Sequence, residues 1–253
     1  MFVAVDIGNS NIVVGIHHNN EWIHLWRWET HLAEAELYYS THIANAFLEN
    51  GIHITETDQI ALSSVVPEMT PDMQKVLQKL FRKEVLVLDP TKTKMIHVSE
   101  DQCREIGSDL VANAIAGYQR YPEGCIIVDF GTALTFTIVS KEGKIIGVNI
   151  LPGIKTAIKS LFGNTSKLPH VPIQLPVSKI GKDTITAIQS GVLWGYTGLI
   201  KQMIQMIREE MEQNLAVIAT GGLSSILTSL DKDFEQIIPS LTLEGMRIEF
   251  SSP

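Results

Sequence analysis

Two short turns in the sequence place a carboxylate beside a glycine and a small polar residue. The first turn follows an apolar run at the N-terminus and contains Asp6, Gly8, Asn9 and Ser10. The glycine removes the side chain that would block the backbone, and the neighbouring N–H, amide and hydroxyl groups can donate to a phosphate. A carboxylate at this place can hold Mg²⁺ through bound water. The turn therefore predicts a site for a phosphate and its cation.

The same pattern returns about half of the chain later, in Asp129, Gly131 and Thr132. A single turn of this kind is more often only a hairpin turn. A second copy, again between two β-rich runs, favours the phosphate-binding interpretation and indicates a duplicated domain. We place the boundary at the turn YPEG, which gives an N-terminal domain of 1–121 and a C-terminal domain of 122–253.

Two further segments carry residues suited to a nucleotide and to a phosphate acceptor. Gly221 and Gly222 follow an apolar run, and backbone without side chains would let a base or a ribose lie directly against it; a tight turn explains the pair equally well. Asp109 follows Gly107 and Ser108 at the start of a predicted helix. Its carboxylate can accept the proton of an aligned hydroxyl, and it can also cap the helix. Gly107 would let the substrate approach it.

The elements that must position these residues alternate between strands and helices. Apolar spacing and end signals predict helices over 33–50, 71–82, 108–118 and 183–214, and strands over 59–65, 84–88 and 216–219. Strands mixed with crossing helices in both halves predict an α/β protein.

Composition excludes several classes of function. The chain has 253 residues, 45% of them hydrophobic, and a net charge of −8 without a basic run, which disfavours nucleic-acid binding. Two cysteines without metal-ligand spacing disfavour a disulfide scaffold or a zinc site and favour a reducing cytoplasm. No apolar stretch reaches the length of a membrane helix, so we expect no membrane association.

Taken together, these motifs resemble the superfamily of actin, hexokinase and the heat-shock ATPases, and in detail they resemble type III pantothenate kinases. The resemblance spans nearly the whole chain, in the family's order, through DIGNS, SSVVP, GSD, DFGTA, GVNILPG, TAIQSG, TGG and LTLEG. It implies two duplicated ribonuclease-H-like domains, each a mixed sheet flanked by helices. It also implies transfer of the γ-phosphoryl group of ATP to the primary hydroxyl of pantothenate, the first step of coenzyme A synthesis, by a homodimer that needs Mg²⁺ and a monovalent cation, K⁺ or NH₄⁺.

The resemblance also assigns roles to particular residues. Asp109 matches the catalytic aspartate, within a GSD motif whose Gly107 and Ser108 line the acceptor site. Asp6 matches the Mg²⁺-associated carboxylate, and Asp129 matches the residue near the monovalent cation. Further matches are Thr184 with a pantothenate-pocket threonine and Gly221 and Gly222 with the adenosine site.

The acceptor pocket departs from the family pattern. Leu110 stands where the family has an arginine that resembles a clamp for the substrate carboxylate, and a leucine makes no charge-assisted bond. Glu100 and Cys103 fall near a usual tyrosine and proline. Lys155, Lys159 and Lys182 are candidates for the missing positive charge. Two alternatives therefore stay open: a kinase of the same superfamily with another small acceptor, and a catalytically weak nucleotide-binding regulatory protein.

Overall fold

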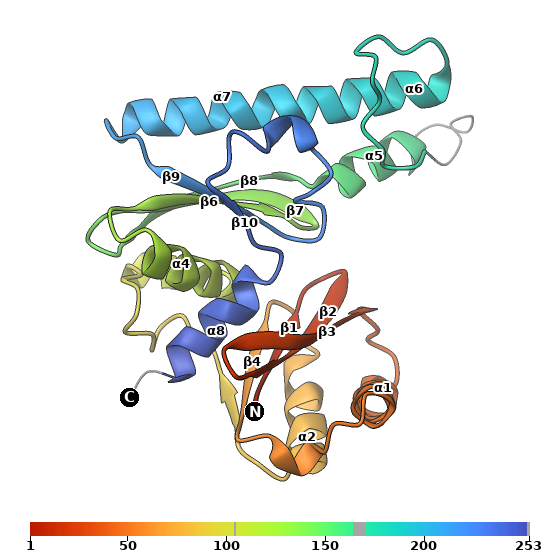
Figure 1. Ribbon diagram of the computed structural model, residues 1–253, viewed down its shortest axis with the longest axis vertical. Helices are drawn as coiled ribbons and strands as arrows, with labels where there is room; N and C mark the ends of the chain where they lie inside the picture. The colour runs from red at the N-terminus through yellow and green to blue at the C-terminus, as the bar shows by residue number, and fades with distance from the viewer. Residues whose placement is uncertain (104, 164–170, 252–253) are drawn as a thin grey trace. The chain divides into compact units, whose positions relative to one another are not determined.

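A computed structural model describes residues 1–103, 105–163 and 171–251 (Figure 1). Contacts between backbone positions divide the chain into two compact units. The first unit contains residues 1–116 and the C-terminal segment that begins at Thr242, and the second contains Gly117–Leu241. The division falls inside helix α4 (Ser108–Arg120). The C-terminal segment thus groups with the N-terminal residues, while the domain limits of 1–121 and 122–253 stay a prediction.

The first unit is built on a five-stranded mixed sheet with the strand order β3-β2-β1-β4-β5. Its strands are β1 (Phe2–Ile7), β2 (Asn11–His18), β3 (Glu21–Glu29), β4 (Gln59–Ser64) and β5 (Val85–Val87). Helices α1 (Ala35–Glu49) and α2 (Thr70–Phe81) cover one face, where Phe47 and Leu77 pack against alternate residues of β1. On the opposite face, Ala112 of α4 and Leu243 and Met246 of α8 (Leu241–Ser251) pack against Phe2 and Ala4.

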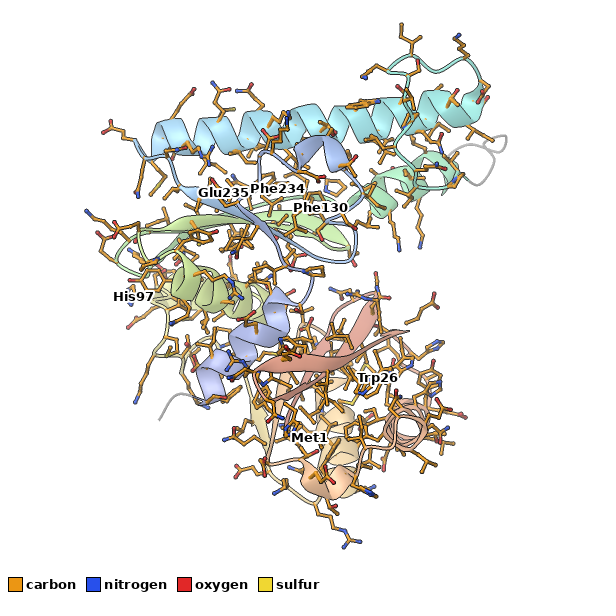
Figure 2. All side chains as sticks on the ribbon, in the orientation of Figure 1. Met1, Trp26, His97, Phe130, Phe234 and Glu235 are labelled. Carbon is orange, nitrogen blue, oxygen red and sulfur yellow. The ribbon has the colours of Figure 1, made fainter. Side chains whose placement is uncertain are left out.

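The second unit has its own five-stranded mixed sheet, in the order β10-β9-β6-β7-β8. Its strands are β6 (Cys125–Phe130), β7 (Ala133–Val139), β8 (Ile145–Pro152), β9 (Ala216–Thr220) and β10 (Gln236–Ile237). Helix α7 (Gly195–Glu210) covers one face, where the rings of Phe130 and Phe234 meet edge to face at 6.1 Å within the core (Figures 1 and 2). The other face meets Gly117 of α4, next to Cys125 and Ile127.

Both sheets have the same connectivity. In each, the first strand pairs antiparallel with the second and parallel with the fourth, and the second pairs antiparallel with the third. The fifth strand pairs parallel with the fourth. This repeat confirms the predicted α/β fold with two duplicated mixed sheets flanked by helices.

The predicted helices are present, with ends shifted by a few residues. The helical region predicted over 183–214 is formed by α6 (Thr184–Gln189), a π-helical turn η2 (Ser190–Trp194) and α7. Helices α3 (Glu100–Cys103), α5 (Ile154–Gly163) and α8 were not predicted. None of the described helices is long and apolar enough to span a bilayer.

Candidate active site

The first turn predicted to bind phosphate joins β1 to β2, and the residue that follows β3 holds it in place. The N–H of Gly8 donates to the Asn11 carbonyl at 2.9 Å. Thr30 contributes two bonds: its hydroxyl donates to the Gly8 carbonyl at 2.7 Å, and its N–H donates to the Ser10 carbonyl at 3.1 Å. Asn9 and Ser10 are exposed at the tip of the turn. The bonds from Thr30 therefore fix the backbone of the turn, while the tip of the turn is exposed and accessible to a ligand.

Thr30 belongs to none of the motifs quoted from the sequence. The available signal is a hydroxyl residue directly after the polar–aromatic alternation of β3. Replacing Thr30 with Val keeps the shape and removes the 2.7 Å bond to Gly8. Because one such bond contributes about 1 kcal/mol, we expect the KM for ATP to rise about fivefold. Steady-state kinetics at varied ATP measures this. Thr41→Val, on the surface of α1, is the matched control and should leave the KM unchanged; an equal KM in both variants would contradict the role of Thr30.

A buried hydroxyl pair connects the end of β4 to the start of α4. Asp6 of β1 lies opposite Ser63 of β4 in the parallel register. The hydroxyls of Ser63 and Ser108 are 3.0 Å apart, and the Ser108 hydroxyl also accepts the N–H of Ser64 at 3.1 Å. Because Ser108 immediately precedes Asp109, the network brings both predicted carboxylates, Asp6 and Asp109, to the same end of the first sheet. The SSVVP and GSD motifs are thus joined by contact.

Asp109 lies in the first turn of α4, and its environment shifts its protonation. Its Oδ1 accepts the N–H of Leu110 at 2.7 Å. Burial raises the pKa of the Asp109 carboxyl, and the backbone N–H groups of Leu110 and of Asp109 itself oppose this rise without cancelling it. A Cβ at Gly107 would lie 2.4 Å from this Oδ1, so Gly107 is needed to make room for the carboxylate. Asp109 therefore accepts a backbone hydrogen bond at the start of α4. Its pKa is raised despite this bond, as is typical of general bases.

The second turn predicted to bind phosphate joins β6 to β7 and is held in a corresponding way. The N–H of Gly153 and the hydroxyl of Thr156 donate to the Thr132 carbonyl at 3.0 and 2.7 Å. A Cβ at Gly153 would lie 2.3 Å from the Gly131 carbonyl oxygen. Gly153 follows β8 as Thr30 follows β3, so the two turns are supported from the same topological position. The role of Gly153 was not predicted, although it closes the quoted GVNILPG motif.

Asp129 lies on the side of the second sheet that bears buried hydroxyls. It is opposite Thr135 of β7 and Thr220 of β9, and paired residues of neighbouring strands share a face. Both threonine hydroxyls are buried and, among the described residues, have no hydrogen-bond partner. Gly221 has a φ of +90°, and a Cβ there would lie 2.5 Å from the Asp129 Oδ1. Gly221 thus permits close packing on Asp129, and Gly222 is exposed beside it.

Two residues predicted to line the acceptor pocket have no hydrogen bond to either turn. Thr184 is exposed at the first residue of α6, after a capping box formed by Asp183 and Thr186, and Glu100 is exposed at the first residue of α3. In the part of the chain that the structure describes, neither side chain makes a hydrogen bond. Their proposed contacts with an acceptor stay predictions.

The chemistry of the candidate donors suits a hydrated magnesium ion. No group of three or more His, Cys, Asp and Glu side chains among the described residues could enclose a metal ion. Mg²⁺ keeps several of its waters and commonly takes one or two carboxylates together with substrate phosphates. A single carboxylate beside a phosphate turn, as at Asp6, fits that mode.

Comparison with known proteins identifies the chain's relatives. A family model described as type III pantothenate kinase matches residues 2–206. A type III pantothenate kinase of Citrifermentans bemidjiense is 38% identical over 98% of both chains. Two solved structures share the fold. The activator of 2-hydroxyisocaproyl-CoA dehydratase from Clostridium difficile has a TM-score of 0.55 and 11% identity, over 97% of this chain and 92% of that chain. MreB 5 of Spiroplasma citri has a TM-score of 0.52 and 12% identity, over 99% of this chain and 96% of that chain. The chain, a phosphotransferase that acts on an alcohol group, belongs to the type III pantothenate kinase family.

Proposed function

We propose that this enzyme transfers the γ-phosphoryl group of ATP to the primary hydroxyl of pantothenate, with Asp109 as the general base. Asp109 carries this proposal: its carboxylate has a raised pKa, lies at a helix start, and is tied through Ser108 and Ser63 to the strand end that bears Asp6. Phosphoryl transfer needs mainly alignment and charge stabilisation, so one positioned base suffices to accept the hydroxyl proton.

The two turns provide the phosphate-binding groups of this proposal. Gly8, Asn9 and Ser10 donate to the phosphates from the first turn, and Gly131 and Thr132 do so from the second. Asp6 holds Mg²⁺ through water, and the ion supplies positive charge against the phosphates when bound. Gly221 and Gly222 contact the adenosine. The exposed tips of the first turn and the exposure of Gly222 support these assignments.

We also propose that Asp129 lies at the site of a monovalent cation, K⁺ or NH₄⁺. Oxygen atoms beside Asp129 that could bind a cation support this proposal. The hydroxyls of Thr135 and Thr220 lie on the same face of the sheet as Asp129, and both are buried without a hydrogen-bond partner among the described residues. A buried hydroxyl without a partner costs free energy. Carboxylate and hydroxyl oxygens bound to a cation would remove that cost.

The remaining parts of the proposal rest on the family resemblance. They are a homodimer, a location in the cytoplasm, and an acceptor pocket that includes Gly107, Ser108, Thr184 and Glu100. Leu110 favours one competing function, a kinase of this fold with a different small acceptor, because the residue after Asp109 cannot bind a carboxylate.

Release of ADP with and without pantothenate tests the function. The purified protein is supplied with ATP, Mg²⁺ and K⁺, and a coupled assay records ADP. We expect ADP formation that depends on pantothenate and is faster with K⁺ than with Na⁺. Bound ATP with no stimulation by pantothenate would overturn the acceptor assignment, and panels of other small alcohols and acids would then separate a different acceptor from a regulatory protein.

A further inference from the structure

The irregular segment 172–183 lies along the helix that follows it. Helices α6 and α7, with the turn η2 between them, form one helical rod, and Thr184 is its first residue (Figure 1). A Cβ at Gly181 would lie 2.2 Å from the Cα of Ala187, so the end of the segment packs directly on the first turn of the rod. Thr184 therefore stands at the bend between the segment and the rod.

Side chains of the rod hold this segment in place. Three of them donate hydrogen bonds to its carbonyls, and we call these bonds the clip: Gln189 Nε2 to Pro172 at 2.9 Å, Trp194 Nε1 to Pro176 at 3.2 Å, and the Ser190 hydroxyl to Lys179 at 2.5 Å. Gln189 and Ser190 are buried, with exposed fractions of 8% and 3%. The three donors lie on η2 or directly before it, and π-helical turns inside α-helices are rare and often occur at functional sites. The clip thus uses the buried polar residues of the TAIQSG motif, which the proposed function leaves without a role.

The segment does not depend on the clip to satisfy its carbonyl groups. Pro172 and Lys179 are exposed residues, so water can bond their carbonyls when a donor of the clip is removed. Only a carbonyl shielded from water would need an internal partner. The clip therefore mainly fixes where the segment lies.

The rod is also bonded to the support of the second turn predicted to bind phosphate. The hydroxyl of Tyr196, at the start of α7, donates to the Pro152 carbonyl at 2.6 Å. The next residue, Gly153, donates its N–H to the Thr132 carbonyl of the turn at 3.0 Å. The clip and the Tyr196 bond together hold Thr184 at a nearly fixed position relative to that turn.

We propose that Gln189 and Ser190 are positioning residues that hold Thr184 where it contacts the acceptor. This assignment rests on the proposed function, in which Thr184 lines the acceptor pocket. Phosphoryl transfer depends on alignment of the acceptor hydroxyl with the phosphate, so a small displacement of a group that binds the acceptor is costly. In this assignment neither Gln189 nor Ser190 touches the acceptor, and each acts through the bend at Thr184.

Substitutions in the clip test the assignment through the split between KM values. Gln189→Met keeps the length of the side chain and removes one bond of the clip, and Ser190→Ala removes another. Because one such bond changes an equilibrium constant about fivefold, we expect each variant to raise the KM for pantothenate about fivefold and to leave the KM for ATP unchanged. Gln205→Met is the matched control, since Gln205 donates to Glu209 on the exposed side of α7, and it should behave as wild type.

A double-mutant cycle with Thr184 separates positioning from a general effect on the fold. If the clip acts through Thr184, Gln189→Met should raise the KM for pantothenate in wild type but not in protein that already carries Thr184→Val. An equal rise in both backgrounds would contradict the positioning role. A wild-type KM in Thr184→Val alone would show that Thr184 does not contact the acceptor and would overturn the assignment.

Hydrogen exchange provides a readout that does not depend on the acceptor. The N–H of Thr186 donates to the Asp183 Oδ1 at 2.8 Å beside the bend. Its exchange should be faster in Gln189→Met and in Ser190→Ala than in wild type, while exchange in β6 stays the same. Unchanged exchange at Thr186 would overturn the positioning role. Wild-type protein that binds ATP without phosphorylating pantothenate would instead overturn the proposed function, and the acceptor contact of Thr184 with it.

Discussion

Asp109→Asn should lower pantothenate-dependent turnover by a factor of about 10² to 10⁴ and leave ATP binding intact. The factor is the usual contribution of a positioned general base. The amide keeps the shape of the side chain and an oxygen that can accept the N–H of Leu110, which Asp109 accepts at 2.7 Å, but it does not take up a proton. Steady-state turnover and calorimetric titration with ATP measure the two properties separately.

Asp72→Asn is the matched control, since Asp72 lies in the first turn of α2 as Asp109 lies in the first turn of α4. It removes the same charge from a helix start where the carboxylate is exposed and pairs with Lys75 at 3.4 Å, and it should retain full turnover. Full turnover in Asp109→Asn would show that another group accepts the proton.

Asp109→Asn should not destabilise the fold at neutral pH. Burial raises the pKa of Asp109 above its unfolded value, so the folded protein binds this proton more tightly than the unfolded chain does. Such a group stabilises the fold fully below the unfolded pKa and loses that contribution as pH rises through the folded pKa. At pH 7 the buried charge is therefore unfavourable, and Asp109→Asn should melt at the wild-type temperature or above. A clearly lower melting temperature would contradict the burial of this charge.

The pH dependence of catalysis follows from the same shift. The base must be deprotonated to act, so kcat/KM should fall on acidification through a pKa above the ordinary value of about 4 for aspartate. A profile of kcat/KM between pH 4.5 and 8 measures this. A profile that stays flat over this whole pH range would rule out a base with a raised pKa.

Gly245→Ala has the largest expected effect on stability. Gly245 lies on α8, and a Cβ there would be 1.8 Å from the carbonyl oxygen and 2.4 Å from the carbonyl carbon of Ala112 on α4. These are backbone atoms of a helix and cannot turn aside, so the two helices must separate. Their separation opens the core that Leu243 and Met246 form with Phe2. We expect a loss of about 3 kcal/mol or more in the free energy of unfolding, at the upper end of overpacking effects.

Chemical denaturation of the purified variant measures this loss, and a helical glycine without neighbours provides the control. Gly198 on α7 has no atom within 4 Å of a built Cβ. Gly198→Ala should therefore be neutral or stabilise by up to about 1 kcal/mol through helix propensity. If the two variants unfold alike, the close packing of α8 on α4 is wrong.

The parts of the fold that repeat in the sequence could be predicted from it. Two Asp-x-Gly turns between β-rich runs indicated two related sheets, and the structure contains one strand order twice. The carboxylates Asp6 and Asp129 stand at corresponding strand ends, as their common motif implied. These features are local, because a turn type and the residues on either side of it are adjacent in the chain.

The features that could not be predicted depend on contacts between distant segments. Thr30 and Gly153 hold the two turns from the far end of a hairpin, and neither belongs to the turn motif. Helix α8 packs on Phe2 and Ala4, more than two hundred residues earlier, so no local pattern reveals that it returns to the first sheet. The row formed by Ser63, Asp6 and Val13 exists only through the register of three strands.

Identification of the reaction product shows directly whether the enzyme phosphorylates pantothenate. After incubation of the protein with ATP, Mg²⁺, K⁺ and pantothenate, mass spectrometry and phosphorus NMR determine the amount of phosphorylated pantothenate and the oxygen that carries the phosphate. We expect one phosphopantothenate for each ADP, with the phosphate on the primary hydroxyl. ADP formed without phosphopantothenate, or a phosphate on another oxygen, would contradict it.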